Sequence, residues 1–64
     1  MFRLQNRLTG FWYIALDDNG KIIWSEYKKY SFVFPSGKRE FWEDDEEIEI
    51  IPLTENEITF IGLL

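Results

Sequence analysis

The chain has 64 residues and a formal net charge of −5, with 19% aromatic residues and neither cysteine nor histidine. The lack of cysteine and histidine excludes disulfides, thiol redox chemistry and the usual zinc sites, and it removes the commonest catalytic bases and nucleophiles. The acidic balance argues against an anionic membrane or a nucleic acid as a direct partner, because both bind basic surfaces. We therefore expect a single domain over residues 1–64 that is not an enzyme and holds no cofactor or metal.

No early segment predicts export or a membrane anchor. The apolar run at residues 11–16 is six residues long and is followed by Asp17 and Asp18. A secretory apolar region needs about 7–15 residues, and a membrane span needs about 20. We expect a cytoplasmic protein without membrane contact.

Three turn signals divide the chain: DDNG at 17–20, PSG at 35–37 and TENE at 54–57. Asn and Gly tolerate a positive φ, and Pro sets φ for the first position of a turn. The stretches between these signals are rich in β-branched and aromatic residues, which predicts strands. In chain order, the expected strands cover residues 8–16, 21–27, 30–34, 38–43, 47–53 and 57–63.

The apolar pattern differs between these strands. Both faces of residues 11–16 are apolar, so the first strand should be central, either inside a barrel or at a subunit contact. In the fifth strand, Ile48 and Ile50 alternate with Glu47 and Glu49. That alternation predicts one buried and one solvated face.

These patterns predict an all-β protein with a five- to six-stranded antiparallel sheet rolled into a small partial barrel. Gly10, Gly20 and Gly37 are expected to permit the turns. An SH3-like or OB-like barrel fits the same length. Glu is a good helix former, so a helix over residues 38–48 is the competing prediction, and it would make the fold α+β.

Three segments carry a family resemblance. LTGFW at 8–12 resembles the L-x-G-x-W opening of small bacterial lipocalin-like domains of the calycin type, and YSFVFPSGKREFW at 30–42 is similar to their Tyr-x-Phe-x-Phe strand and glycine turn. EEIEIIPLTENEITF at 46–60 is similar to their late hairpin. The resemblance implies a shortened barrel that binds a small ligand among inward-facing rings. At this length we expect those rings to fill the interior instead. They are Trp12, Trp24, Phe32, Phe34 and Phe60.

Charge is segregated along the chain. Residues 1–39 carry a net charge of +4, and residues 40–64 carry −9 with no basic residue. Six of the seven residues from 43 to 49 are carboxylates. One interpretation is structural, because acids on a solvated edge keep sheets from pairing with neighbours. Basic residues beside aromatics at 27–30 and 38–41 are expected to form surface ion pairs rather than to bind nucleic acid.

The other interpretation of the acidic run is a docking surface. Alternate carboxylates on a strand lie about 6.6–6.8 Å apart, close to every second phosphate of a DNA strand at about 3.4 Å each. We therefore expect a non-enzymatic module that docks on a basic, nucleic-acid-binding protein, as small inhibitors from phages and mobile elements do. The alternatives are a lipocalin-like ligand binder and a structural homodimer joined through residues 8–16. The expected contact residues are Phe41, Trp42, Glu43, Asp44, Asp45, Glu46, Glu47 and Glu49, with the two rings as the apolar anchor.

Overall fold

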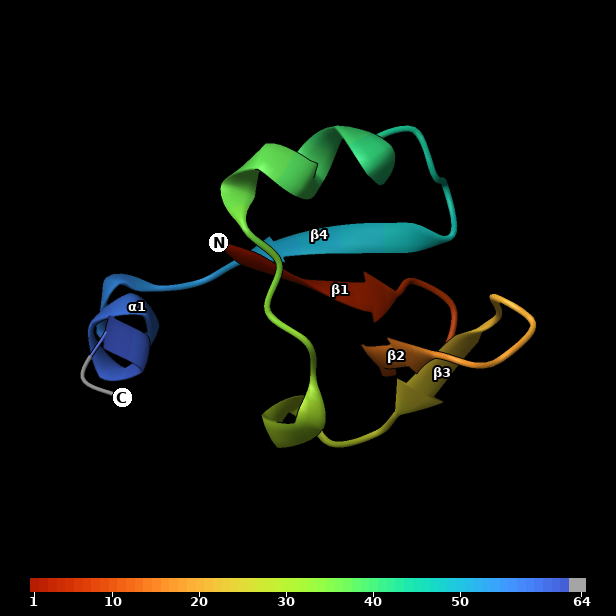
Figure 1. Cartoon of the computed structure of the whole chain (residues 1–64), viewed down its shortest axis with the longest axis horizontal. Coiled ribbons are helices and arrows are strands. Elements are labelled where there is room, and N and C mark those ends of the chain that lie inside the picture. The colour runs from red at the N-terminus through yellow and green to blue at the C-terminus, as the bar shows by residue number, and fades with distance from the viewer. Residues whose placement is uncertain (63–64) are drawn as a thin grey trace.

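The computed structural model describes residues 1–62, and its centre is a four-stranded antiparallel sheet in the order β3-β2-β1-β4 (Figure 1). Two short 3-10 helices follow β3, and one α-helix follows β4. The elements in chain order are β1 Phe2–Asn6, β2 Trp12–Leu16, β3 Ile22–Ser25, η1 Lys28–Tyr30, η2 Ser36–Phe41, β4 Ile48–Pro52 and α1 Glu55–Gly62.

β1 organises the sheet because it pairs with different partners along its two edges. It pairs with β4 over its whole length, from Phe2 opposite Pro52 to Asn6 opposite Ile48. Its other edge meets β2 only where Gln5 lies opposite Trp12. At the start of β1, Phe2 instead exchanges two backbone hydrogen bonds with Phe34, of 3.0 and 2.8 Å.

The extended segment 31–34 lies between β1 and β2 where these two strands diverge. The Phe32 amide donates to the Tyr13 carbonyl at 3.0 Å, while Phe34 bonds to Phe2 on the other side. Backbone groups on both neighbouring strands are thereby satisfied, as buried backbone requires. The same alternation puts Phe32 and Phe34 on one face of the segment, where their rings lie 4.7 Å apart.

The core lies between one face of the sheet and the chain that crosses it. Leu4, on β1, is fully buried, and Arg3 and Gln5 point to the opposite face of the sheet. Aromatic rings dominate the cluster, with Tyr13 edge-on to Phe34 at 5.0 Å and to Trp42 at 5.7 Å. The buried cluster is Phe2, Leu4, Tyr13, Phe34 and Ile48, and Ile22, Trp24, Trp42 and Ile50 pack against it.

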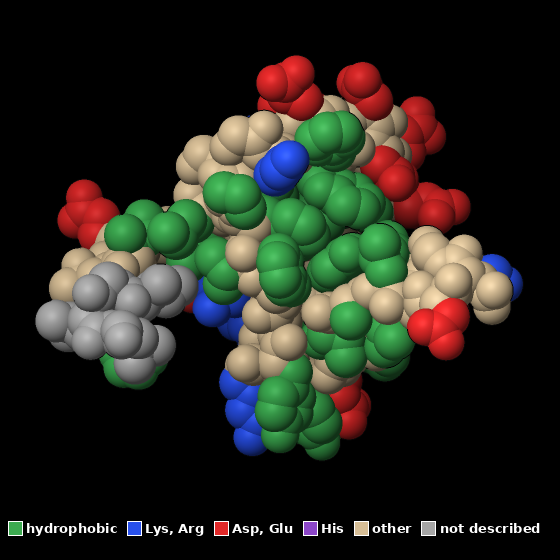
Figure 2. All heavy atoms as spheres, viewed as in Figure 1, with side chains coloured by type: hydrophobic (Ala, Val, Ile, Leu, Met, Phe, Trp, Pro, Cys, Tyr) green, Lys and Arg blue, Asp and Glu red, His purple; other side chains and the backbone are tan. Residues whose placement is uncertain are grey.

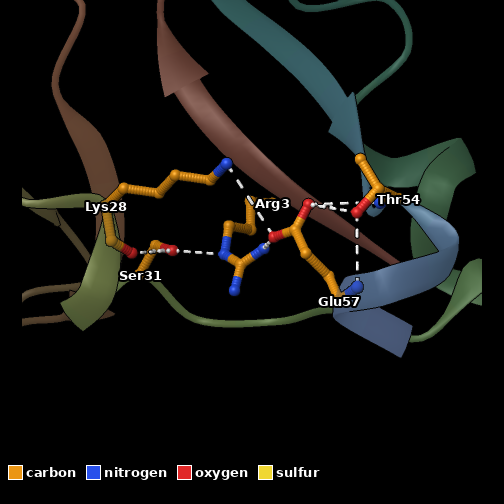
Figure 3. Close-up of polar contacts among 5 residues, drawn as sticks. All are labelled: Arg3, Lys28, Ser31, Thr54 and Glu57. Atoms are coloured by element: carbon orange, nitrogen blue, oxygen red, sulfur yellow. Dashed lines mark hydrogen bonds and ion pairs between the residues drawn. The ribbon is translucent and has the colours of Figure 1, made fainter. Parts of the chain in front are cut away.

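α1 lies to one side of the sheet and begins with a capping box (Figures 1 and 3). The Thr54 side-chain oxygen accepts from the Glu57 amide at 3.2 Å, and a Glu57 carboxylate oxygen accepts from the Thr54 amide at 3.1 Å. Two unpaired donors at the helix start are satisfied reciprocally. Arg3, on the face of β1 opposite the core, forms an ion pair with the same carboxylate.

Three of the six predicted strands are present: β2, β3 and β4 lie within 8–16, 21–27 and 47–53. β2 lies between β3 and β1, the interior position that its two apolar faces predicted. β1 was not predicted, although F-R-L-Q-N alternates. The expected strand at 30–34 reduces to the single bridge at Phe34. Gly10 and Gly20 have the positive φ that their turns require, but Gly37 does not and lies in η2.

The strand prediction for 38–43 was wrong. Residues 36–41 form the 3-10 helix η2, and turns follow it as far as β4. Residues 37–40 are all polar or glycine, so this stretch has no alternate apolar positions with which to line a sheet. The competing prediction of a helix over 38–48 also fails, because the 3-10 helix ends at Phe41.

The strand prediction for 57–63 was also wrong, since residues 55–62 form α1; residue 63 lies outside the described part of the chain. The expected barrel of five or six strands is not formed either. Within residues 1–62 the sheet has four strands and stays open, with β3 and β4 at opposite edges. Two of the three missing strands are replaced by helices and the third by the single bridge at Phe34, so no described strand joins the edges.

Candidate functional site

An apolar groove lies on the surface of the described residues. It has a volume of about 510 Å³ and lies between the extended segment before η2 and η2 itself. Figure 2 shows hydrophobic side chains gathered in the middle of one face of the molecule, with acidic side chains along the upper edge of that face. The groove is lined by Phe32, Phe34, Pro35, Lys38, Phe41 and Trp42.

The floor of the groove is held by the core. Phe34 is buried and stacks on Phe2 with ring centroids 5.2 Å apart and planes 9° from parallel. Trp42 is half-buried, and its ring lies 5.8 Å from that of Phe34. Both rings are therefore fixed in place by packing, which gives the groove a preformed apolar floor.

The outer wall of the groove is exposed. Phe41 is 73% exposed and Phe32 is 50% exposed. The Lys38 ammonium lies over the face of the Phe41 ring, 5.4 Å from its centroid. Lys38 is the one ionisable group among the residues that line the groove. The lining contains no carboxylate, thiol or imidazole.

The acidic run starts directly beyond Trp42. All six acids, Glu43, Asp44, Asp45, Glu46, Glu47 and Glu49, are exposed. Two of them have structural contacts: Glu43 pairs with Arg39 at 3.2 Å, and an Asp45 carboxylate oxygen accepts from the Glu47 amide at 3.0 Å. Within residues 1–62 the other four form no ion pair, and no three acids gather into a metal-binding group.

The run is mostly turn rather than strand. β4 begins at Ile48, so Glu49 lies on the strand and Glu47 immediately precedes it. Residues 43–46 lie in the turn region between η2 and β4. Only Glu47 and Glu49 can therefore have the carboxylate spacing of a strand that the sequence predicted for the run. The remaining acids follow in the chain directly after Trp42, which lines the groove.

The outer edge of β4 is only partly protected, because no hydrogen bond within residues 1–62 engages the outward backbone groups of Ile50 in its middle. The Arg7 amide donates to the Glu47 carbonyl and the Leu53 amide to the Met1 carbonyl, so odd-numbered residues of β4 bond to β1 and even-numbered ones face outward. Of these, Ile48 has its amide bonded to the Asp45 carbonyl and its carbonyl to the Arg7 guanidinium. Pro52 has no N–H to offer.

The predicted contact residues thus fall into two groups. Phe41 and the six acids are on the surface and adjoin one another. Trp42 is different, since its ring packs on Tyr13 and Phe34 and only part of it faces the groove. Its main contacts are those of a core residue. Sequence reasoning could not tell which of two adjacent rings would be buried.

The expectation that five rings fill the interior was wrong, since Phe34 is buried but Phe32 is 50% and Phe60 is 65% exposed. The five do not line one pocket either. Phe32 and Phe34 line the groove. Trp24 packs against the core, Trp12 has the Lys28 ammonium over its ring at 5.6 Å, and Phe60 is exposed on α1. Lys38 and Pro35 also line the groove but were not predicted to do so. The available signal was the sequence FVFPSGK, in which the alternation of F-V-F places Phe32 and Phe34 on one face directly before the turn residues.

Comparison of the chain with protein-family models, with curated proteins and with solved structures finds no match. Among residues 1–62, no helix combines the length and the apolar character that crossing a bilayer requires. Function must therefore be argued from the groove and the acidic run themselves.

Proposed function

We propose that the protein is a non-enzymatic binding module whose acidic run, residues 43–49, docks on a basic surface of a partner protein. The observation that carries this proposal is the position of Phe41, a ring 73% exposed on the wall of an apolar groove directly before the run. An exposed aromatic anchor flanked by polar groups is the usual composition of an interface hot spot.

The partial protection of the β4 edge leaves less for the acids to do in preventing aggregation. The Asp45 carbonyl and the Arg7 guanidinium occupy the outward groups of Ile48, and Pro52 has no N–H, while within the described residues the outward groups of Ile50 stay open to a second strand. Six exposed acids in seven positions repel one another, which costs stability unless something offsets it. A partner rich in Lys and Arg would offset it, and proteins that bind nucleic acids present such surfaces.

The test is capture of a partner from the native cytoplasm at low and high salt. In the test variant, Asp44 and Asp45 become Asn while Glu46 and Glu47 become Gln. The Asn at 45 keeps a carbonyl that can accept from the residue 47 amide, so the turn should persist. We expect the variant to fold as the parent does, by circular dichroism, and to lose the partner. In the parent, high salt should weaken binding steeply, since exposed charges are screened within about 8 Å at physiological ionic strength.

A charge-matched control separates the site from net charge. Four neutralisations elsewhere change the charge by the same amount, and this control should retain the partner at low salt. Equal binding by the parent and the run-neutralised variant would show that the run has no docking role. The control substitutions are Asp17→Asn, Asp18→Asn, Glu26→Gln and Glu55→Gln.

A second candidate is the small-ligand binder. The groove volume of about 510 Å³ falls in the usual range for ligand pockets, about 300–1,000 Å³, and Phe32 and Phe34 of the expected set line it. An apolar fluorescent dye such as 1-anilinonaphthalene-8-sulfonate should then bind with 1:1 stoichiometry and be lost in Phe32→Ala. Dye binding unchanged in that variant would exclude the groove as the ligand site.

A further inference from the structure

We infer that the groove receives a cationic side chain of the partner, an arginine in preference to a lysine, and that Lys38 is the chain's own occupant of that place. The inference rests on the proposed docking function and specifies what enters the groove. It goes beyond charge attraction, because it assigns the aromatic wall a direct part in recognising a cation.

The first support is the position of Lys38. Its ammonium lies 5.4 Å from the centroid of the Phe41 ring, within the range in which the negative face of an aromatic ring attracts a cation. The groove thus already holds a positive charge against its exposed wall. Phe41 and Phe32 both keep about half or more of their surface free for a second contact.

The second support is the negative charge of the acidic run beside the groove. The groove's own single charge, Lys38, is positive, so the attraction for a further cation comes from carboxylates outside the lining. The nearest part of the acidic run follows Trp42, and there Glu43 already pairs with Arg39. Asp44, Glu46 and Glu47 have no ion pair within residues 1–62. A segment with consecutive cations could place one over the rings and others against these carboxylates.

An apolar side chain is the rival occupant, and Lys38 disfavours it. An apolar group would either cover the Lys38 ammonium without supplying a counter-charge, which is unfavourable, or displace it and lose its contact with the Phe41 ring. An incoming guanidinium would displace Lys38 and restore a cation over that ring. Arginine suits the place better than lysine because its planar group stacks on rings and is more weakly hydrated.

The experiment uses a hexa-arginine peptide as the probe, with binding to the full chain measured by titration calorimetry at low salt. Phe41→Leu keeps an apolar side chain but removes the ring, and Phe41 is exposed enough for the fold to tolerate the change. We expect it to weaken binding by about two- to five-fold, the size of one exposed cation–π contact. Hexa-lysine should bind more weakly than hexa-arginine to the parent.

Lys38→Gln removes the internal competitor, and Lys21→Gln removes the same charge in the β2–β3 turn. Both should strengthen binding through net charge, and Lys38→Gln should do so about two- to five-fold more. Equal effects of the two substitutions, or an unchanged affinity in Phe41→Leu, would overturn the groove assignment. So would tighter binding of a peptide in which leucine replaces one arginine, or no binding of hexa-arginine to the parent.

The two proposals can fail separately. If the run-neutralised variant loses the peptide while Phe41→Leu and Lys38→Gln behave like their controls, docking through the acids stands and the groove assignment is wrong. If the run-neutralised variant binds its captured partner as tightly as the parent at low salt, the docking proposal itself is wrong. A dependence on Phe41 and Lys38 measured with hexa-arginine would then describe a cation site that the partner does not use.

Discussion

Arg3 on β1 and Glu57 in the first turn of α1 form an ion pair across 54 residues of sequence, and it ties the C-terminal helix to the sheet (Figure 3). The Arg3 guanidinium also donates to the Ser31 hydroxyl at 2.7 Å. The Lys28 ammonium lies 3.8 Å from the same Glu57 oxygen, and the other carboxylate oxygen accepts from Thr54. One carboxylate therefore links three separate segments of the chain.

The first prediction is that Glu57→Gln loosens α1 without unfolding the sheet. The glutamine loses the charge that pairs with Arg3, while its side-chain oxygen can still accept from the Thr54 amide in the capping box. A hydrogen bond to a charged group is worth about 1.5–3 kcal/mol, so amide exchange in α1 should rise by about ten-fold or more. Amides of β1 and β4 should change far less, because none of residues 55–60 belongs to the buried core cluster. Hydrogen exchange read by NMR measures both.

Glu55→Gln is the matched control for that experiment. Glu55 also lies in the first turn of α1, but it is exposed and its side chain has no ion pair within residues 1–62. Equal acceleration of α1 exchange in the two variants would mean that charge near the helix start, rather than the Arg3 contact, controls the helix.

The second prediction concerns pH. The hydrogen bond from the Thr54 amide, and then the hydrogen bond and charge of Arg3, hold the pKa of Glu57 below its ordinary value of 4.5. A carboxyl whose pKa is lowered by folding stabilises the folded state above its unfolded pKa, and that stabilisation is lost as pH falls through the folded pKa. Helical circular dichroism of α1 should therefore fall below about pH 4.5 in the parent. In Glu57→Gln this step should be absent; a step of the same size in both proteins would assign it to other carboxyls.

The misassignment of α1 shows what local sequence could and could not supply. T-x-x-E at 54–57 is a helix-start signal that was available in the sequence. It was outweighed by the strand propensity of Ile58, Thr59 and Phe60. An eight-residue helix is marginal alone, and the contact that anchors it comes from Arg3 at the other end of the chain. That long-range contact could not be predicted from either segment.

The third prediction compares two leucines at the ends of the burial scale. Leu4 is 0% exposed in the middle of β1, and Leu8 is 93% exposed in the turn after it. Leu4→Ala should lower the free energy of unfolding by about 2–5 kcal/mol, because it leaves a cavity beneath the aromatic cluster. Leu8→Ala should change it by about 0.5 kcal/mol or less. Urea denaturation measures both, and a small effect at Leu4 would contradict its place at the centre of the core.

The fourth prediction concerns the glycines. Gly10 and Gly20 have φ of 77° and 78°, a conformation that other residues adopt at a cost. Replacing either by Ala should destabilise the fold by about 1 kcal/mol or more. Gly37 has no positive φ and open space around its Cα. Gly37→Ala should be neutral or stabilise by up to about 1 kcal/mol, because it restricts the unfolded chain. Equal losses at all three positions would show that Gly37 too is needed for turning.

The β2–β3 turn and β4 were predictable because their signals are local. Asp17 and Gly20 close the β2–β3 turn with a 3.0 Å backbone hydrogen bond, as D-x-N-G indicated. The groove was less predictable. Its floor depends on Phe34 pairing with Phe2, two residues that are far apart in sequence. Once that pairing is made, the orientation of η2 about its own axis determines whether Phe41 or Trp42 enters the core. No pattern in the sequence specifies that orientation.

The fifth prediction separates those two rings. Trp42 contacts the rings of Tyr13 and Phe34, while Phe41 is mostly in solvent. Trp42→Ala should lower the free energy of unfolding by about 2–4 kcal/mol, somewhat less than for a fully buried aromatic residue. Phe41→Ala should leave it within about 0.5 kcal/mol. Thermal and urea unfolding of the two variants measure the difference. If Phe41→Ala proved the more damaging, the ring in the core would be Phe41, and neither the groove wall nor its cation contact could be as described.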